Sequence, residues 1–319
     1  MSPLPAYRGP FGTRQAERLL WRAGFGPLPG EARELASQGL ERAVHTLTRP
    51  RRGALDGPPP ADPGGRRLAA GEIPGHEVLW WVDRMARSNQ PLVERMALIW
   101  QDWFAGRVRD PLNHDRDATR FVERLWSYFV PTPPCDRTRR ELERVYTLSG
   151  RRISPVVEAI LMHPDLYQGE AMVKPPIVFV VGMLRARCRG IDESSAGWVL
   201  ELAREGLLDP PYLSAGDESR WLENPGLRTR WTAVSNTVGP DAVDPSDDVD
   251  VEGPRAAVDR ALRYWGGPRI KRATRWELED FALRVEKAIG PSENAGTYRV
   301  LRQRALRVLV ATAPEMARC

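Results

Sequence analysis

The sequence contains little cysteine and almost no lysine. Its three cysteines, Cys135, Cys188 and Cys319, lie far apart and lack CxxC spacing, so they indicate neither a disulfide scaffold nor a zinc knuckle nor a redox pair. Lysine occupies three positions among 47 basic residues, which face 42 acidic ones, so arginine supplies most of a small, dispersed positive charge. Few aromatic residues accompany the arginine runs, so weak nucleic-acid binding is only a minor alternative.

Long apolar runs are also missing. The longest uncharged apolar stretch, Ile177 to Leu184, is far shorter than the roughly 20 residues that a helix needs to cross a bilayer. Residues 1–15 show no basic segment followed by an apolar core and a small-residue cleavage site, which is the pattern of a secretory signal. These absences predict a cytoplasmic protein that does not contact a membrane.

Short catalytic motifs are absent as well. The chain has no G-x-S-x-G elbow, no G-x-x-x-x-G-K-[ST] loop and no G-x-G-x-x-G after a strand, so we assign no catalytic residue and no cofactor. The most metal-like string, Asp248 to Gly253 followed by Asp259, has the alternating oxygen ligands of a calcium loop. Arg255 stands at a normally apolar position of such a loop, so we interpret the string as an acidic linker and expect no metal.

Helical periodicity, in contrast, runs through most of the chain. Apolar residues recur at i, i+3, i+4 and i+7, the spacing of one helix face, and strict alternation over the length of a strand is hard to find. The sequence predicts an all-α fold, an irregular multi-helix bundle of about a dozen helices with most of its 11 Trp residues in the core. The clearest apolar stripes lie at residues 16–23, 78–85, 93–100, 118–129, 177–188 and 278–289.

Composition shifts suggest where the chain divides. Proline and glycine concentrate at residues 50–74, which predicts an exposed connection inside a main helical domain of residues 1–240. Residues 241–252 contain acids and no bases, so we predict an acidic linker at 241–254. Residues 255–319 are then expected to form a C-terminal helical hairpin packed on the main domain.

An acidic residue inside an aromatic helical run is the first candidate binding group. Asp102 lies between Trp100 and Trp103, where burial would raise the pKa of its carboxyl group unless a cation pairs with it. Arg107 or Arg109, about one turn further along, could supply that charge. We favour structural pairing, and keep Trp100, Asp102 and Trp103 as candidate binding residues.

A histidine next to an acid provides the second candidate group. His114 and Asp115 precede an apolar helical stripe, where an N-terminal cap is the simpler interpretation. The alternative is a metal-assisted or hydrolytic enzyme in which Asp102, His114, Asp115 and Lys174 converge on a Trp-lined pocket. That alternative requires the four side chains to meet in one concave site.

Several segments, in order along the chain, resemble one bacterial family. Residues 16–27, AERLLWRAGFGP, are similar to the opening motif of the domain-of-unknown-function family 1800 (DUF1800), and residues 92–104, LVERMALIWQDWF, resemble its "FWHdHF" helix. Further resemblances lie at residues 121–129, 153–186, 210–231 and 308–319. The sequence is therefore identified as a member of that family, whose biochemical role is uncharacterised.

The departures from the family pattern affect the functional hypothesis. The family carries a long central block between two motifs that here end at Phe104 and start at Phe121, so this block is missing. Of the paired histidines in the remaining motif, one is replaced by Gln101 and the other by Trp103, and only Asp102 is kept. The groups that a family member could use for metal or proton chemistry are therefore lost.

These observations favour a non-catalytic interaction or scaffold protein, a shortened member of its family. The resemblance also implies a context, since family members are often exported and often encoded beside a sulfatase-like protein of the 1501 family. That neighbour is the candidate partner, although the missing signal pattern argues against export of this chain.

Overall fold

The computed structural model describes residues 4–49, 53–105, 118–208, 221–239, 252–289 and 295–319. Within these ranges the chain forms 15 α-helices and one short 3-10 helix, with isolated β-bridges but no β-strand. The predicted all-α, multi-helix fold is confirmed, and the number of helices is slightly higher than the dozen expected. None of the described helices is both long enough and apolar enough to span a bilayer.

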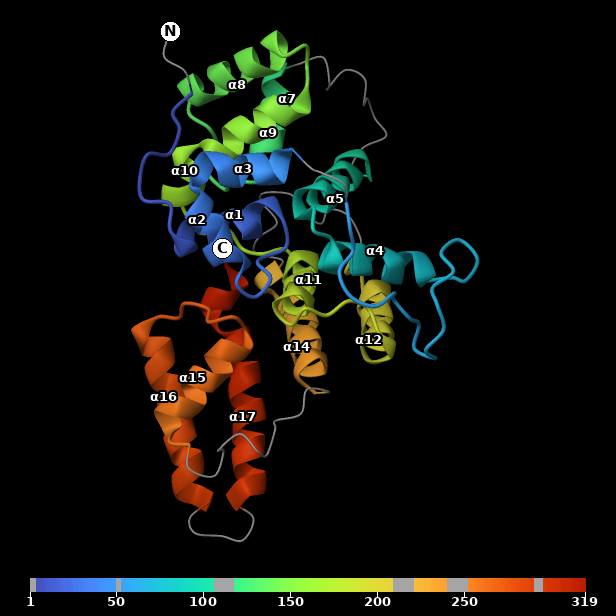
Figure 1. Ribbon diagram of the computed structural model, residues 1–319, viewed down its shortest axis with the longest axis vertical. Coiled ribbons are helices and arrows are strands. Elements are labelled where there is room, and N and C mark those ends of the chain that lie inside the picture. The colour runs from blue at the N-terminus through green and yellow to red at the C-terminus, as the bar shows by residue number, and fades with distance from the viewer. Residues whose placement is uncertain (1–3, 50–52, 106–117, 209–220, 240–251, 290–294) are drawn as a thin grey trace.

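The helices form three groups along the long axis of the molecule (Figure 1). The group that contains most of the amino-terminal helices comprises α1 (Thr13–Ala23), α2 (Glu31–Gln38), α3 (Leu40–Thr48), α7 (Ala118–Ser127), α8 (Asp136–Leu148), α9 (Ile153–Met162) and α10 (Pro164–Gln168). The middle group comprises α4 (His76–Arg87), α5 (Pro91–Ala105), α11 (Pro176–Ala186), α12 (Glu193–Arg204) and α14 (Asn224–Val238). The opposite end comprises α15 (Pro254–Tyr264), α16 (Arg272–Ile289) and α17 (Ala295–Thr312). The 3-10 helix η1 (Pro314–Ala317) follows α17 and leads the chain back to α1, beside which the C-terminus lies (Figure 1).

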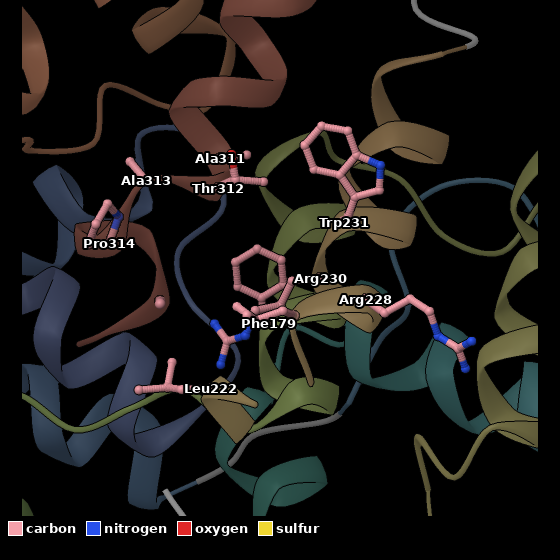
Figure 2. Close-up of a pocket in the computed structure, with 11 residues that line it drawn as sticks. Phe179, Leu222, Arg228, Arg230, Trp231, Ala311, Thr312, Ala313 and Pro314 are labelled. Carbon is pink, nitrogen blue, oxygen red and sulfur yellow. The ribbon is translucent and has the colours of Figure 1, made fainter. Parts of the chain in front are cut away.

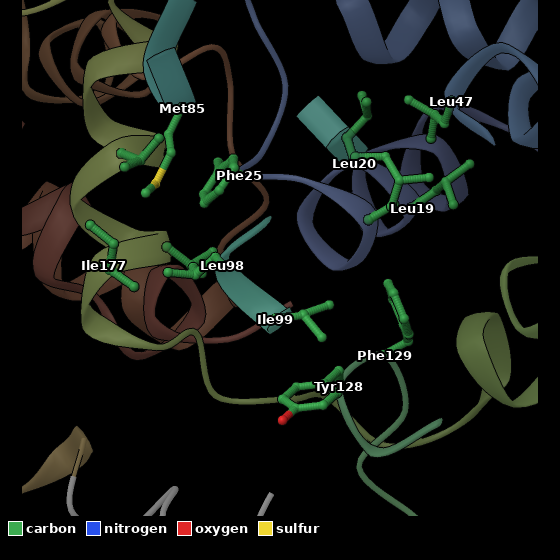
Figure 3. Close-up of a cluster of buried hydrophobic side chains, with 14 of the residues drawn as sticks. Leu19, Leu20, Phe25, Leu47, Met85, Leu98, Ile99, Tyr128, Phe129 and Ile177 are labelled. Carbon is green, nitrogen blue, oxygen red and sulfur yellow. The ribbon is translucent and has the colours of Figure 1, made fainter. Parts of the chain in front are cut away.

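The predicted apolar stripes account for the larger of two hydrophobic cores. Leu19 and Leu20 of α1, Ile99 of α5 and Phe129 after α7 are all buried in it (Figure 3). Trp126, which is fully buried, belongs to the same cluster. Residues far apart in the sequence thus bury their apolar faces together, which provides the main driving force for this fold.

The second core joins the C-terminal helices to the middle group. Phe179 of α11 and Val234 of α14 belong to the same buried cluster as Val258 of α15 and Val310 of α17. Residues 254–312 form three helices, α15 to α17, which pack against one another. The domain boundaries inferred from composition stay a prediction.

Buried arginines connect segments that are distant in the sequence. Arg22, of which 1% is exposed, donates hydrogen bonds to the backbone carbonyl oxygens of Phe129, Glu170 and Cys319 at 2.6, 3.0 and 2.9 Å. Arg185 is fully buried and donates in the same way to the carbonyl oxygens of Gly26, Ala86 and Ser88. The main-chain oxygens give both buried guanidinium groups hydrogen-bond acceptors, although Glu170 also accepts from Arg18 and Cys319 from the Met172 backbone N–H.

Candidate functional site

Asp102, the retained acid of the aromatic run, is buried near the C-terminal end of α5. Only 2% of it is exposed, and the hydroxyl group of Tyr128 donates a hydrogen bond to its Oδ2 atom at 2.8 Å. Tyr128 directly follows α7, so this bond joins the two helices that flank residues 106–117. The Asp102 carboxylate therefore has a structural partner 26 residues away in the sequence.

Trp103, on the same helix as Asp102, lies at the centre of a cluster of aromatic rings. Its ring centroid is 5.4 Å from that of Trp100, 5.4 Å from that of Phe121 and 6.2 Å from that of Tyr128. The guanidinium of Arg124 stacks over the Trp103 ring at 4.3 Å, a cation–π geometry. Trp103 thus packs α5 against α7.

Burial dominates the electrostatics around Asp102. It raises the pKa of the Tyr128 hydroxyl well above its ordinary value, and the negative charge of Asp102 adds to this effect. Burial also lowers the pKa of the Arg95 guanidinium to about 10, although the charge of Asp102 acts in the opposite direction. The expected counter-charges, Arg107 and Arg109, lie outside the described residues. Arg95, on which the Asp102 charge acts, lies on the same helix two turns before Asp102. The sequence analysis predicted a counter-charge about one turn after Asp102 and did not predict Arg95.

Lys174 lies in different surroundings from Asp102. Only 2% of it is exposed, its Nζ atom donates a hydrogen bond to the carbonyl oxygen of Met316 at 2.8 Å, and it stands 3.5 Å from the centre of the Trp21 ring. Burial lowers the pKa of this amine to about 8.

Two of the four groups that the enzyme alternative requires, Asp102 and Lys174, lie within the described residues. His114 and Asp115, which that alternative requires, lie outside the described residues. The carboxylate of Asp102 faces Tyr128, and the amine of Lys174 faces an indole ring and a carbonyl oxygen. Within the described ranges, no three His, Cys, Asp or Glu side chains are grouped so that they could hold a metal ion.

A buried histidine elsewhere has a local structural role. The Nδ1 atom of His76 accepts a hydrogen bond from the Ala69 backbone N–H at 3.0 Å, and its Nε2 atom lies 3.6 Å from Oδ2 of Asp62. The Asp62 carboxylate also accepts hydrogen bonds from the backbone N–H groups of Gly64 and Arg66. This network orders the proline- and glycine-rich connection, which accounts for the burial of both side chains.

One concave site among the described residues was not predicted from the sequence. It is a pocket with a volume of about 770 Å³ between α11, α14 and the C-terminal end of α17 (Figure 2). Most of its wall is apolar, and the cationic groups in it come from α14. The lining residues are Phe179, Leu222, Leu227, Arg228, Arg230, Trp231, Ala311, Thr312, Ala313, Pro314 and Ala317.

Arg230 carries a positive charge at the inner part of this pocket. Its side chain passes beside Phe179 into the space between Leu222 and Pro314 (Figure 2), and only 4% of the residue is exposed. Nη2 donates a hydrogen bond to the Lys174 carbonyl oxygen at 2.6 Å, whereas Nε and Nη1 have no hydrogen-bond partner. Burial lowers the pKa of this guanidinium to about 10.

The rim of the pocket has a different character. Leu227 and Trp231, one helical turn apart on α14, are 50% and 55% exposed. Arg228 lies between them in sequence and forms an ion pair with Glu205 at 2.9 Å. A sequence signal for this site exists, because Leu227 and Trp231, four residues apart, enclose two arginines. In the sequence analysis these residues served only as part of the family resemblance.

A family model gives the evolutionary context of this architecture. The model of a protein of unknown function, DUF1800, matches residues 18–114 and 106–318, which together span most of the chain. The chain belongs to the DUF1800 family. No curated protein and no solved structure matches it.

The DUF1800 match also has an internal division. Its two segments overlap at residues 106–114, within the interval where the resemblance predicts that the family's central block is missing. The aromatic cluster and the Asp102–Tyr128 hydrogen bond lie on the helices at either side of this interval. Family membership itself supplies no activity, so any function has to be argued from the side chains.

Proposed function

We propose that this DUF1800 protein is a non-catalytic interaction protein that binds a protein partner through its C-terminal helices. The observation that carries the proposal is a set of large apolar side chains exposed on α16 and α17. Trp276 is 62% exposed and Leu283, two turns later on α16, is 38% exposed. On α17, Tyr298 and Leu301 are 47% and 51% exposed.

Exposed aromatic and aliphatic side chains of this size are costly to solvate and favour burial against a partner. The two helices pack against each other and against α15, so they present these side chains from a formed scaffold. The exposed set therefore needs no conformational change before it binds.

The surroundings of the candidate catalytic groups support the non-catalytic part of the proposal. Asp102 and Trp103 hold α5 against the α7 region, and Lys174 is bonded to a carbonyl oxygen beneath an indole ring. Each of these groups makes contacts that a structural role explains.

The candidate partner is inferred from the family resemblance and not from the geometry of the exposed side chains. The sulfatase-like protein of the 1501 family, implied by the resemblance, is the candidate to test first, and we place the interaction in the cytoplasm. Fractionation of the native host tests the location, and recovery of the protein outside the cytoplasm would contradict it.

The experiment is capture of partners from native-host lysate by tagged protein, followed by mass spectrometry. Wild type is compared with the double variant Trp276→Glu, Leu301→Glu and with the matched control Trp80→Glu, which changes a tryptophan that is 44% exposed on α4. We expect a stoichiometric partner with wild type and with the control, and its loss with the double variant.

Two results would contradict the proposal. The first is a partner that binds all three proteins equally, because the C-terminal helices would then not carry the interaction. The second is stoichiometric metal in the purified protein whose removal by a chelator lowers stability, because that would favour metal chemistry.

A further inference from the structure

The pocket around Arg230 is built differently from a packing defect. Its volume of about 770 Å³ lies within the usual range for small-molecule sites, roughly 300–1,000 Å³. Apolar side chains from three helices form its wall, and one buried cation lies among them. A few polar groups in a largely apolar cavity are what orient a bound organic molecule.

Among the described residues, the buried cation has no anionic partner. The guanidinium of Arg230 has one protein acceptor, the Lys174 carbonyl oxygen, and its Nε and Nη1 groups have none. The ring of Phe179 at 4.9 Å offers a weak electrostatic contact and no hydrogen bond. A buried guanidinium that keeps two unpaired N–H groups is unfavourable unless an acceptor reaches it.

Lys174 is a second buried cation near Arg230. Burial is the main cause of the lowered pKa of Lys174, repulsion from Arg230 adds to it, and the charges of Cys319 and Glu17 act in the opposite direction. At the rim, Arg228 is already paired with Glu205. The unmatched positive charge is therefore concentrated at Arg230.

We propose that this pocket binds an amphiphilic organic anion. The anionic group accepts hydrogen bonds from Arg230, and an apolar body lies against Phe179, Leu222 and Trp231. This inference is independent of the protein partner proposed for α16 and α17, because it concerns a small ligand held by other residues.

The test uses two fluorescent probes with nearly the same apolar body. 1-Anilinonaphthalene-8-sulfonate carries an anionic group, and N-phenyl-1-naphthylamine lacks it. We expect wild type to bind the sulfonate at least about tenfold more tightly than the neutral probe, because charge-assisted hydrogen bonds form only with the anion. Octanoate should displace the sulfonate, and octanol at the same concentration should not.

Three variants separate charge, space and general stability. Arg230→Met should remove the preference for the anion, and Thr312→Trp, at an exposed position on the pocket wall, should weaken binding of both probes by filling the pocket. Arg95→Met is the matched control, since Arg95 is equally buried and also has unpaired Nε and Nη1 atoms but lies outside the pocket. It should retain the preference.

Three results would overturn the inference. They are equal affinity of wild type for the two probes, an unchanged preference in Arg230→Met, and unchanged binding of both probes in Thr312→Trp. Because the wild-type comparison and the Thr312 variant do not depend on the Arg230 variant, misfolding of Arg230→Met leaves the inference testable.

Discussion

Replacing Arg22 by methionine tests whether buried guanidinium groups hold the amino-terminal helices together. The substitution keeps an unbranched side chain of similar length in the core and removes three hydrogen bonds to the carbonyl oxygens of Phe129, Glu170 and Cys319. The Glu170 oxygen keeps its hydrogen bond from Arg18, and the Cys319 oxygen keeps its bond from the Met172 backbone N–H. The Phe129 oxygen is therefore the acceptor that loses its donor, and none of the apolar packing has to be removed.

The expected loss can be worked out from these contacts. A hydrogen bond from a charged donor contributes about 1.5–3 kcal/mol, so three of them contribute up to roughly 5–9 kcal/mol before opposing terms. Removing the guanidinium also removes its own desolvation cost, which is several kcal/mol for a buried ion. We expect Arg22→Met to lower the free energy of unfolding by about 1–3 kcal/mol, the cost of leaving one buried carbonyl oxygen without a donor.

The assay is urea denaturation followed by circular dichroism, with Arg284→Met as control. Arg284 lies on α16, its side chain is 68% exposed and it forms one ion pair with Asp280 at 3.0 Å, so its loss should change stability by about 1 kcal/mol or less. If Arg22→Met is as stable as the control, the carbonyl contacts of Arg22 contribute little and the reasoning is wrong.

Three further predictions concern close packing, thiol reactivity and pH. Gly182→Ala should destabilise the protein by about 1–3 kcal/mol, because the new methyl group on α11 would lie 2.3 Å from an α1 indole ring. Gly197→Ala on α12, where a methyl group meets nothing within 4 Å, should stabilise it by roughly 0.5–1 kcal/mol, and thermal melts that move both variants in the same direction would contradict this. Hydrogen bonds from the Thr138 side chain and backbone lower the pKa of the Cys135 thiol. Near neutral pH, iodoacetamide should therefore label Cys135 faster than Cys188, which is also exposed. Equal labelling rates, measured by peptide mass spectrometry, would refute this prediction. Burial lowers the pKa of Lys174 from 10.5 to about 8, so between pH 8 and 10.5 the unfolded chain binds more protons than the folded one. The free energy of unfolding of wild type should therefore rise with pH relative to that of Lys174→Met. A difference between the two proteins that stays constant over this range would disprove this.

Local periodicity was sufficient to predict the helices but not their neighbours. The stripe at residues 78–85 became α4, His76–Arg87, and the stripe at 278–289 became part of α16, with Leu278 and Ala282 buried. These stripes predict which face is apolar because one helix turn follows from adjacent residues. Which helices meet depends on where the connections direct the chain, and the apolar pattern carries no such information.

The candidate site shows the same division. The sequence predicted that Asp102 is paired, with a cation about one turn away on the same helix. The hydrogen-bond partner is instead Tyr128, which reaches the carboxylate because α7 returns to α5. The sequence did not predict the pocket because residues 179, 230 and 311 come from three helices, α11, α14 and α17, that pack together only in the fold. A helix-spacing argument can propose a buried charge on α14, but it cannot show that the charge faces a cavity.

The contacts of Arg22 and Arg185 have a further consequence for how this sequence can evolve. Their acceptors are main-chain oxygens, which every amino acid provides, so positions such as 129 and 170 can change identity without breaking the bond. Only the arginine is constrained, and no compensating change is required at the other end. Paired substitutions among relatives would therefore reveal the apolar contacts of this protein and leave these long-range connections unseen.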